Sequence, residues 1–166
     1  SIFYRARAPL RIGFAGGGTD VSPFSETNGG CVLNATIDLY AHSYLKPIPE
    51  NIIKFQALDI EKSQHLGIKE ISYLEFNEEL PLHIAVLKSI KRNFSPKFEE
   101  GFELTSYSDC PPGSGLGSSS TMTVCLIKVL IDYFGINLNE YELADLAYEI
   151  ERKDLGFEGG KQDQYA

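Results

Sequence analysis

The residues best suited to bind a ligand form a run of small side chains, Pro-Pro-Gly-Ser-Gly-Leu-Gly-Ser-Ser-Ser, at positions 111–120. An apolar stretch follows directly and predicts a helix from Thr121 to Phe134, ended by Gly135. Glycines leave backbone amides free to converge, and a helix start adds further unpaired amides. The run therefore predicts a site for phosphate oxygens. Its serine hydroxyls could cap the helix or contact phosphate or magnesium.

The glycine spacing excludes three common phosphate loops. Gly113, Gly115 and Gly117 step by two, and the run contains no lysine. A Walker A loop needs Gly-Lys-Ser/Thr, whereas dinucleotide and protein-kinase loops place the third glycine three residues after the second. A flexible turn with a serine cap is the simpler alternative. The two prolines and the apolar stretch that follows argue against it.

Strands and helices must position this loop. Alternating or β-branched stretches predict extended structure at 2–15, broken by Pro9, a long strand or hairpin arm at 30–46, and strands at 52–58 and 101–107. A helix should begin at Pro81, and another at the capping box of Asn139 and Glu142. This order predicts an α+β domain on an open sheet. Because the sequence stops just after a glycine loop, we expect it to be a fragment of a longer protein.

Composition limits the partners. The formal net charge of −8 over 166 residues argues against nucleic acid and anionic membranes as partners. No apolar run approaches the roughly 20 residues of a spanning helix, and the N-terminus lacks a signal-peptide pattern. Cys31, Cys110 and Cys125 have no metal or redox spacing, so we expect buried free thiols in a reducing compartment. These features predict a cytoplasmic protein.

The run from Asp109 to Ser120 resembles the nucleotide loop of the GHMP kinases, which include galactokinase, homoserine kinase and mevalonate kinase. The resemblance implies that this chain, residues 1–166, is the N-terminal ATP-binding domain, with a βαβ unit like that of some ribosomal proteins and a C-terminal domain that the chain lacks. It also implies that Ser119 ligates magnesium. Ser120 is a departure, because these kinases usually carry alanine there. The ATP contacts implied are Pro112, Gly113, Ser114, Gly115, Leu116, Gly117, Ser118 and Ser119.

Two further matches flank the loop. Residues 7–20 resemble the N-terminal motif of sugar-type GHMP kinases, in which an arginine precedes the aspartate of a Thr-Asp pair by nine residues, as Arg11 precedes Asp20. The resemblance implies that Arg11 lies near the transferred phosphate, as a catalytic and substrate-binding residue. Asp20 would bind sugar hydroxyls. The other implied substrate contacts are Gly17, Gly18 and Thr19.

The third match lies at the end of the chain. Galactokinase-like enzymes place a magnesium-binding glutamate twelve residues before the aspartate of a Gly-x-x-Asp-Gln motif, and Glu151 and Asp163 keep that separation. The resemblance implies that Glu151 is a metal ligand beside Ser119. It implies that Asp163 is catalytic and accepts or orients the proton of the attacking hydroxyl.

The pair Gly17-Gly18 stands where galactokinases have Glu-His, and this version resembles bacterial heptose 7-phosphate kinases. The resemblance implies an enzyme that uses ATP and magnesium to phosphorylate the anomeric hydroxyl of a heptose 7-phosphate, giving the 1,7-bisphosphate for nucleotide-activated heptose and surface polysaccharide. Four basic residues could bind the 7-phosphate: Arg92, Arg152, Lys153 and Lys161.

Several alternatives stay open. The protein could be a fucokinase- or galactokinase-like enzyme, a mevalonate-type kinase, or a non-catalytic nucleotide- or sugar-binding relative. Its net charge disfavours a nucleic-acid-binding domain. Taken singly, Arg11 could be a surface charge, Asp20 a helix cap, Glu151 an exposed carboxylate and Asp163 a loop residue. The sequence makes no prediction about oligomeric state.

Overall fold

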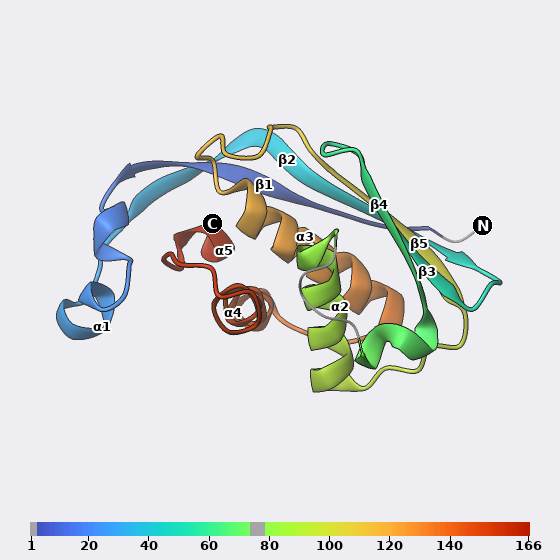
Figure 1. Ribbon diagram of the computed structural model, residues 1–166. Coiled ribbons are helices and arrows are strands. Elements are labelled where there is room, and N and C mark those ends of the chain that lie inside the picture. The colour runs from blue at the N-terminus through green and yellow to red at the C-terminus, as the bar shows by residue number, and fades with distance from the viewer. Residues whose placement is uncertain (1–2, 74–78) are drawn as a thin grey trace.

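The computed structural model describes residues 3–73 and 79–166, which form one sheet and a layer of helices (Figure 1). The strands are β1 (Tyr4–Ala15), β2 (Leu33–Ile48), β3 (Ile52–Ala57), β4 (Lys62–Gly67) and β5 (Gly101–Ser108). The helices are α1 (Phe24–Asn28), α2 (Pro81–Phe94), α3 (Ser118–Phe134), α4 (Glu140–Glu149) and α5 (Gln162–Tyr165). Shorter turns are η1 (Gly17–Thr19), η2 (Ile68–Ser72) and η3 (Ile150–Asp154), the last a π-helical continuation of α4.

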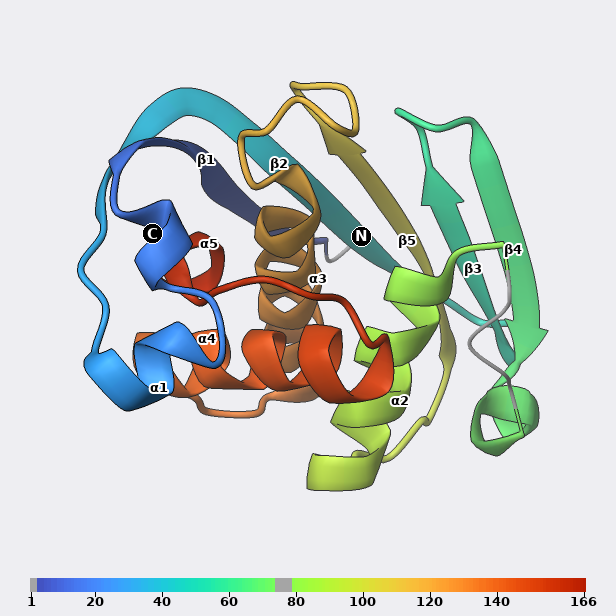
Figure 2. The same ribbon diagram turned by 60° about the vertical axis from the view of Figure 1, so that its left-hand side comes forward.

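The five-stranded sheet has the order β1-β2-β5-β3-β4. The pairing of β3 with β5 is parallel and the other pairings are antiparallel. The parallel strands β3 and β5 are connected through α2 and form the expected βαβ unit, with β4 inserted between β3 and α2. Figures 1 and 2 show α2, α3 and α4 on one face of the curved sheet. The α+β prediction is therefore confirmed.

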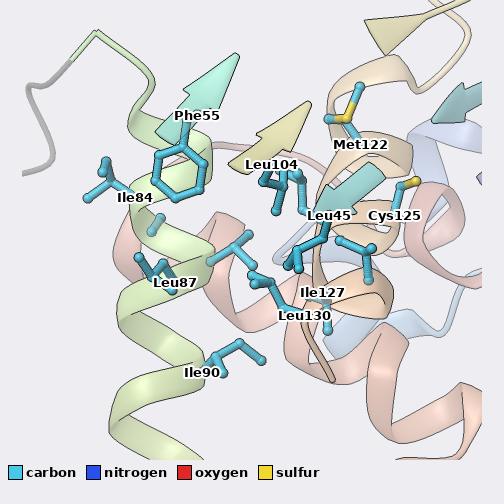
Figure 3. Close-up of a cluster of buried hydrophobic side chains, with 14 of the residues drawn as sticks. Leu45, Phe55, Ile84, Leu87, Ile90, Leu104, Met122, Cys125, Ile127 and Leu130 are labelled. Atoms are coloured by element: carbon cyan, nitrogen blue, oxygen red, sulfur yellow. The ribbon is translucent and has the colours of Figure 1, made fainter. Parts of the chain in front are cut away.

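The core lies between the sheet and helices α2 and α3 (Figure 3). Every second residue of the central strands points into it, such as Ile53 and Phe55 on β3 and Phe102 and Leu104 on β5. This two-residue period is what a sheet covered on one face requires. The inner face of β1 ends at Leu10, and its outer half from Arg11 to Ala15 is exposed or half-buried. The core thus anchors strands whose far ends extend toward the glycine segments.

Two expectations about the elements are corrected, and one strand was missed. Strand β1 continues through Pro9 with only a register shift before Arg11, because β1 is an edge strand where a missing amide is tolerated. Helix α3 begins at Ser118, three residues before the predicted start at Thr121. Strand β4 was not predicted, because it is a polar edge strand in which only Leu66 is buried.

The prediction that the cysteines are buried holds for only one of the three. Cys125 is buried in α3, and burial raises its pKa to about 11. Cys31 is exposed and Cys110 is half-buried, so the expectation of three buried thiols is wrong for these two. All three thiols are free. Among the described residues, no helix is long and apolar enough to cross a membrane.

Candidate functional site

The glycine loop leads from β5 into α3. Gly113, Gly115 and Gly117 adopt left-handed conformations, with φ of 80°, 76° and 73°. Left-handed residues alternating with others match the backbone pattern of anion-binding nests. Gly117 is the N-cap of α3 and makes no side-chain capping bond. The serine-cap alternative is therefore wrong, and the first-turn amides of α3 face the same end as the loop.

Arg11 at the outer end of β1 holds this loop at two points. Its backbone amide donates to the Leu116 carbonyl at 3.2 Å, and Nη1 donates to the Gly115 carbonyl at 2.9 Å. Its Nε donates to Asp163 Oδ1 at 2.5 Å, and Nη2 completes an ion pair with the same oxygen. Arg11 is therefore not a free surface charge. It ties the loop to the Gly-x-x-Asp-Gln motif.

Gly117 makes this approach sterically possible. A Cβ atom there would lie 3.1 Å from Asp163 Cγ and 3.4 Å from Arg11 Nε. The φ of 73° at Gly117 also disfavours any other residue. Gly117 thus allows the left-handed conformation of the loop and the close approach of the ion pair between Arg11 and Asp163.

Asp20 joins the N-terminal motif to the C-terminal motif. Its Oδ2 accepts hydrogen bonds from the amides of Lys161 at 2.6 Å and Gln162 at 2.8 Å, at the start of α5. A Cβ atom on Gly160 would lie 2.0 Å from this oxygen, so only glycine fits. Asp20 is thus a helix cap, as the simpler alternative predicted. Its Oδ1 has no hydrogen-bond partner within residues 3–73 and 79–166.

The neighbours of Asp20 form the short turn η1. The Thr19 hydroxyl donates to the Gly16 carbonyl at 2.7 Å and accepts from the Cys31 amide at 3.1 Å, so it holds the turn in place. Gly17 lines a hollow together with Arg11 and Gln162.

Glu151 lies in η3 and is only 2% exposed. The Ser120 hydroxyl donates to its Oε1 at 2.9 Å, and Gln164 Nε2 donates to its Oε2 and, at 3.1 Å, to Ser120 Oγ. Burial raises the pKa of Glu151, and the hydrogen bonds from Gln164 and Ser120 oppose that shift. Glu151 is therefore not an exposed carboxylate. The loop serine that contacts it is Ser120, whereas Ser119 is exposed.

Three of the four basic candidates already have partners. Arg152 donates to the carbonyls of Phe157, Gly159 and Gly160 at 3.1, 3.1 and 2.7 Å, which fixes the glycine segment before α5. Arg92 pairs with Asp154, and Lys153 pairs with Glu149. The ammonium of Lys161 lies 5.1 Å from the ring centre of Tyr148. Lys161 also lines a hollow with Asp20 and Gln162.

A cavity of about 260 Å³ adjoins the loop and was not predicted. Its walls include Pro112 and Ser119 of the loop, Met122 of α3, and His83 of α2. Burial lowers the pKa of His83 to about 4, so its ring is neutral at pH 7. His83 Nε2 lies 2.8 Å from Ser106 Oγ. The sequence placed His83 among apolar residues of a helix and gave no signal for a cavity.

The glycine loop at a helix start, with an arginine and two carboxylates around it, has the parts of a phosphate-transfer site. The sequence model described as GHMP kinases N terminal domain matches residues 81–166, just over half of the chain. The chain therefore belongs to the GHMP kinase family.

Comparison with individual proteins shows which kinases of this family the chain resembles. The chain is 44% identical over 162 residues to the D-glycero-alpha-D-manno-heptose 7-phosphate kinase of Campylobacter jejuni, covering 98% of this chain and 47% of that protein. It is 27% identical over 171 residues to a galactokinase of Clostridium beijerinckii, covering 100% of this chain and 41% of that one. The chain spans about half the length of these relatives or less.

Solved structures of kinases have the same fold as this chain. A crystal structure of a D-glycero-D-manno-heptose 1-phosphate kinase from Bacteroides thetaiotaomicron superposes with a TM-score of 0.91 at 46% identity. The match covers 99% of this chain and 53% of that one. The galactokinase of Lactococcus lactis shares the fold, with a TM-score of 0.82 at 24% identity. That match covers 99% of this chain and 41% of the galactokinase chain. The predicted N-terminal GHMP kinase fold is confirmed.

Proposed function

We propose that the protein is an ATP-dependent sugar kinase that phosphorylates the anomeric hydroxyl of a heptose 7-phosphate, giving the 1,7-bisphosphate. The observation that carries this proposal is the ion pair of Arg11 and Asp163 directly behind the glycine loop. The pair places the Arg11 guanidinium and the Asp163 carboxylate, which can accept a proton, next to the backbone of the glycine loop. Similarity to the heptose 7-phosphate kinase of Campylobacter jejuni supports the choice of sugar.

In this proposal, the triphosphate of ATP binds along the loop from Pro112 to Ser119, where the left-handed glycines leave amides free. The adenine ring of ATP occupies the adjoining cavity of about 260 Å³, which has Pro112 and Ser119 in its wall. Apolar walls with a few polar groups suit a flat heterocycle. Neutral His83 and the Ser106 hydroxyl supply such groups.

Magnesium would be held by Glu151 and Ser119. The donor chemistry fits, because both residues offer the oxygen ligands that magnesium prefers. Within the described residues no group of three His, Cys, Asp or Glu side chains could hold a metal alone, so water and phosphate oxygens would supply the further ligands. Bound magnesium would neutralise charge on the phosphates during transfer. Ser120 and Gln164 hold the Glu151 carboxylate in a fixed orientation.

In the transfer step, the anomeric hydroxyl gives its proton to Asp163 and its oxygen forms a bond to the γ-phosphorus. The bond from that phosphorus to the β,γ-bridging oxygen breaks, and ADP leaves with the electron pair. Arg11 stabilises charge on the moving phosphoryl group. Positioning and electrostatics supply most of the catalysis in such reactions, so this small set of groups is sufficient.

The sugar would bind near η1 and the start of α5. Asp20 accepts from a sugar hydroxyl through Oδ1, while Gly17, Gly18 and Thr19 shape the site. Lys161 is the best candidate for the 7-phosphate, because Arg92, Arg152 and Lys153 are engaged elsewhere. It also lines a hollow with Asp20.

The experiment is a kinase assay with ATP, magnesium and a panel of heptose 7-phosphate, free heptose, galactose and fucose. ADP release measures turnover, and phosphorus NMR identifies the phosphorylated position. We expect the highest kcat/KM for heptose 7-phosphate, with the new phosphate at the anomeric carbon. A preference for fucose or galactose would favour the other sugar kinases. ATP binding without turnover on any sugar would favour a non-catalytic relative.

A further inference from the structure

We propose that Gln162 determines sugar specificity by hydrogen-bonding substrate hydroxyls through its side-chain amide, an inference that rests on the proposed function. Gln162 precedes Asp163 and was not predicted as a site residue. Its Oε1 is buried without a hydrogen-bond partner among the described residues. Its Nε2 also makes no hydrogen bond within that part of the chain.

The unpartnered Oε1 of the half-buried Gln162 has an energetic cost. A buried acceptor without a partner costs about 1–3 kcal/mol relative to a satisfied one. The backbone of Gln162 is fully used, because its amide donates to Asp20 and its carbonyl accepts from Ala166. The side chain alone remains unsatisfied. Unpaired buried polar groups in native proteins need an explanation, and a bound ligand is one.

The position of the amide points to the sugar. Cβ atoms built on Gly13 and Gly17 would lie 3.5 Å from its Oε1 and 3.3 Å from its Nε2, so the amide packs against glycines of the N-terminal motif. Gln162 borders two hollows. One also contains Arg11 and Gly115 beside the phosphate loop, and the other contains Asp20. The amide therefore lies between the phosphate side and the Asp20 side of the site.

The chemistry of an amide fits a polyhydroxyl ligand. It offers one acceptor and two donors without charge, and a hydroxyl can both donate and accept. Two neighbouring sugar hydroxyls can therefore be bound at once. The nearby carboxylates, one oxygen of each already bonded within the protein, can only accept from hydroxyls, whereas the amide can also donate to them. A site that hydrogen-bonds a substrate hydroxyl rejects analogues that lack it much more strongly than an apolar pocket does.

The first test compares wild-type protein with Gln162→Met, which keeps the length of the side chain but removes the amide. We expect KM for heptose 7-phosphate to rise about 10- to 100-fold, consistent with the loss of one or two hydrogen bonds, while KM for ATP stays within about twofold. The matched control is Gln56→Met on β3, because Gln56 is exposed. A parallel rise in KM for both substrates would mean a structural role and overturn the proposal.

A second test identifies the hydroxyls. Wild type and Gln162→Met are titrated by calorimetry with heptose 7-phosphate and its single-deoxy analogues, each in the presence of magnesium and a non-hydrolysable ATP analogue. We expect one or two deoxy analogues that bind both proteins equally, because the lost partner is the same. If every analogue loses the same factor in both proteins, Gln162 contacts no hydroxyl.

These outcomes separate the two proposals. If wild type neither binds nor phosphorylates any sugar tested, the proposed function and the role of Gln162 both fail. If wild type phosphorylates a sugar but Gln162→Met behaves like Gln56→Met, only the role of Gln162 fails. Gln162→Asn guards against misfolding, because it keeps the amide but retracts it by one methylene. We expect it to bind the sugar with intermediate affinity.

Discussion

The two carboxylates of the site, Asp163 and Glu151, are held in opposite ways. Asp163 pairs with the Arg11 guanidinium, and its side chain is 24% exposed. Glu151 is 2% exposed and receives its hydrogen bonds from two uncharged side chains, Ser120 and Gln164. One acid therefore has a cationic partner near solvent, and the other has neutral partners in the interior.

This difference matters because surroundings decide what a carboxylate does. The Arg11 guanidinium binds the Asp163 carboxylate and holds it beside the last glycine of the loop. Burial works against the charged form of Glu151, whose pKa is raised. A buried carboxylate with neutral partners keeps its affinity for a cation that arrives with the nucleotide. The comparison thus supports a base in Asp163 and a metal ligand in Glu151.

The largest expected effect is on turnover. We expect Asp163→Asn to lower kcat by about 10²–10⁴-fold, the usual contribution of a general base. The matched control is Asp132→Asn, which breaks the exposed pair of Asp132 with Lys128 on α3. Steady-state rates with saturating ATP and heptose 7-phosphate measure the effect. Near-normal turnover of Asp163→Asn would show that the two carboxylates do not differ in the way proposed.

A smaller effect is expected on the pH dependence of stability. Because the pKa of Glu151 is raised in the folded state, the wild type loses stability as pH rises from the ordinary value of 4.5 through the raised pKa. Glu151→Gln removes this loss, so its stability relative to wild type should increase with pH. Urea unfolding with a chelator present, from pH 4 upward, measures the difference.

The control for this series is Glu149→Gln, two residues earlier at the end of α4, where the carboxylate is exposed and pairs with Lys153. Its difference from wild type should vary little over the same pH range. A flat difference for Glu151→Gln as well would mean that burial does not govern this carboxylate.

The smallest expected effect concerns Ser120. We expect Ser120→Ala to reduce the free energy of unfolding by about 1–2 kcal/mol at pH 7, because Glu151 loses a donor. Ser43→Ala is the control, since the buried Ser43 hydroxyl donates at 2.9 Å to the neutral carbonyl of Cys125. The loss should be smaller there, and equal losses would argue that the carboxylate gains nothing special from Ser120.

The sequence predicted the frame of the site better than its interior. Glycine spacing and the apolar stretch identified the loop and α3, and two-residue alternation identified β5, because these signals are local. The resemblance supplied the separations of Arg11 from Asp20 and of Glu151 from Asp163. Their proposed roles stay predictions, whereas the fold and family are confirmed.

What the sequence could not predict depends on contacts between distant residues. The burial of Glu151 depends on contacts with Ser120 of α3 and Gln164 of α5, and the capping role of Asp20 depends on Gly160 lying against it. Ser120 stood out only as a departure from the family alanine. Gln162 and His83 could be recognised as candidate site residues only from the structure, in which each lines a cavity.

The ion pair between Arg11 and Asp163 joins residues 152 positions apart. A ribosome makes the chain from its N-terminus, so the strands and the glycine loop are synthesised before Asp163. Closing so long a segment costs conformational entropy that only the packed core can offset. The site should therefore be among the last parts of this domain to form. A nascent chain that ends before α5 would carry the phosphate loop without the contact that holds Arg11 against Asp163.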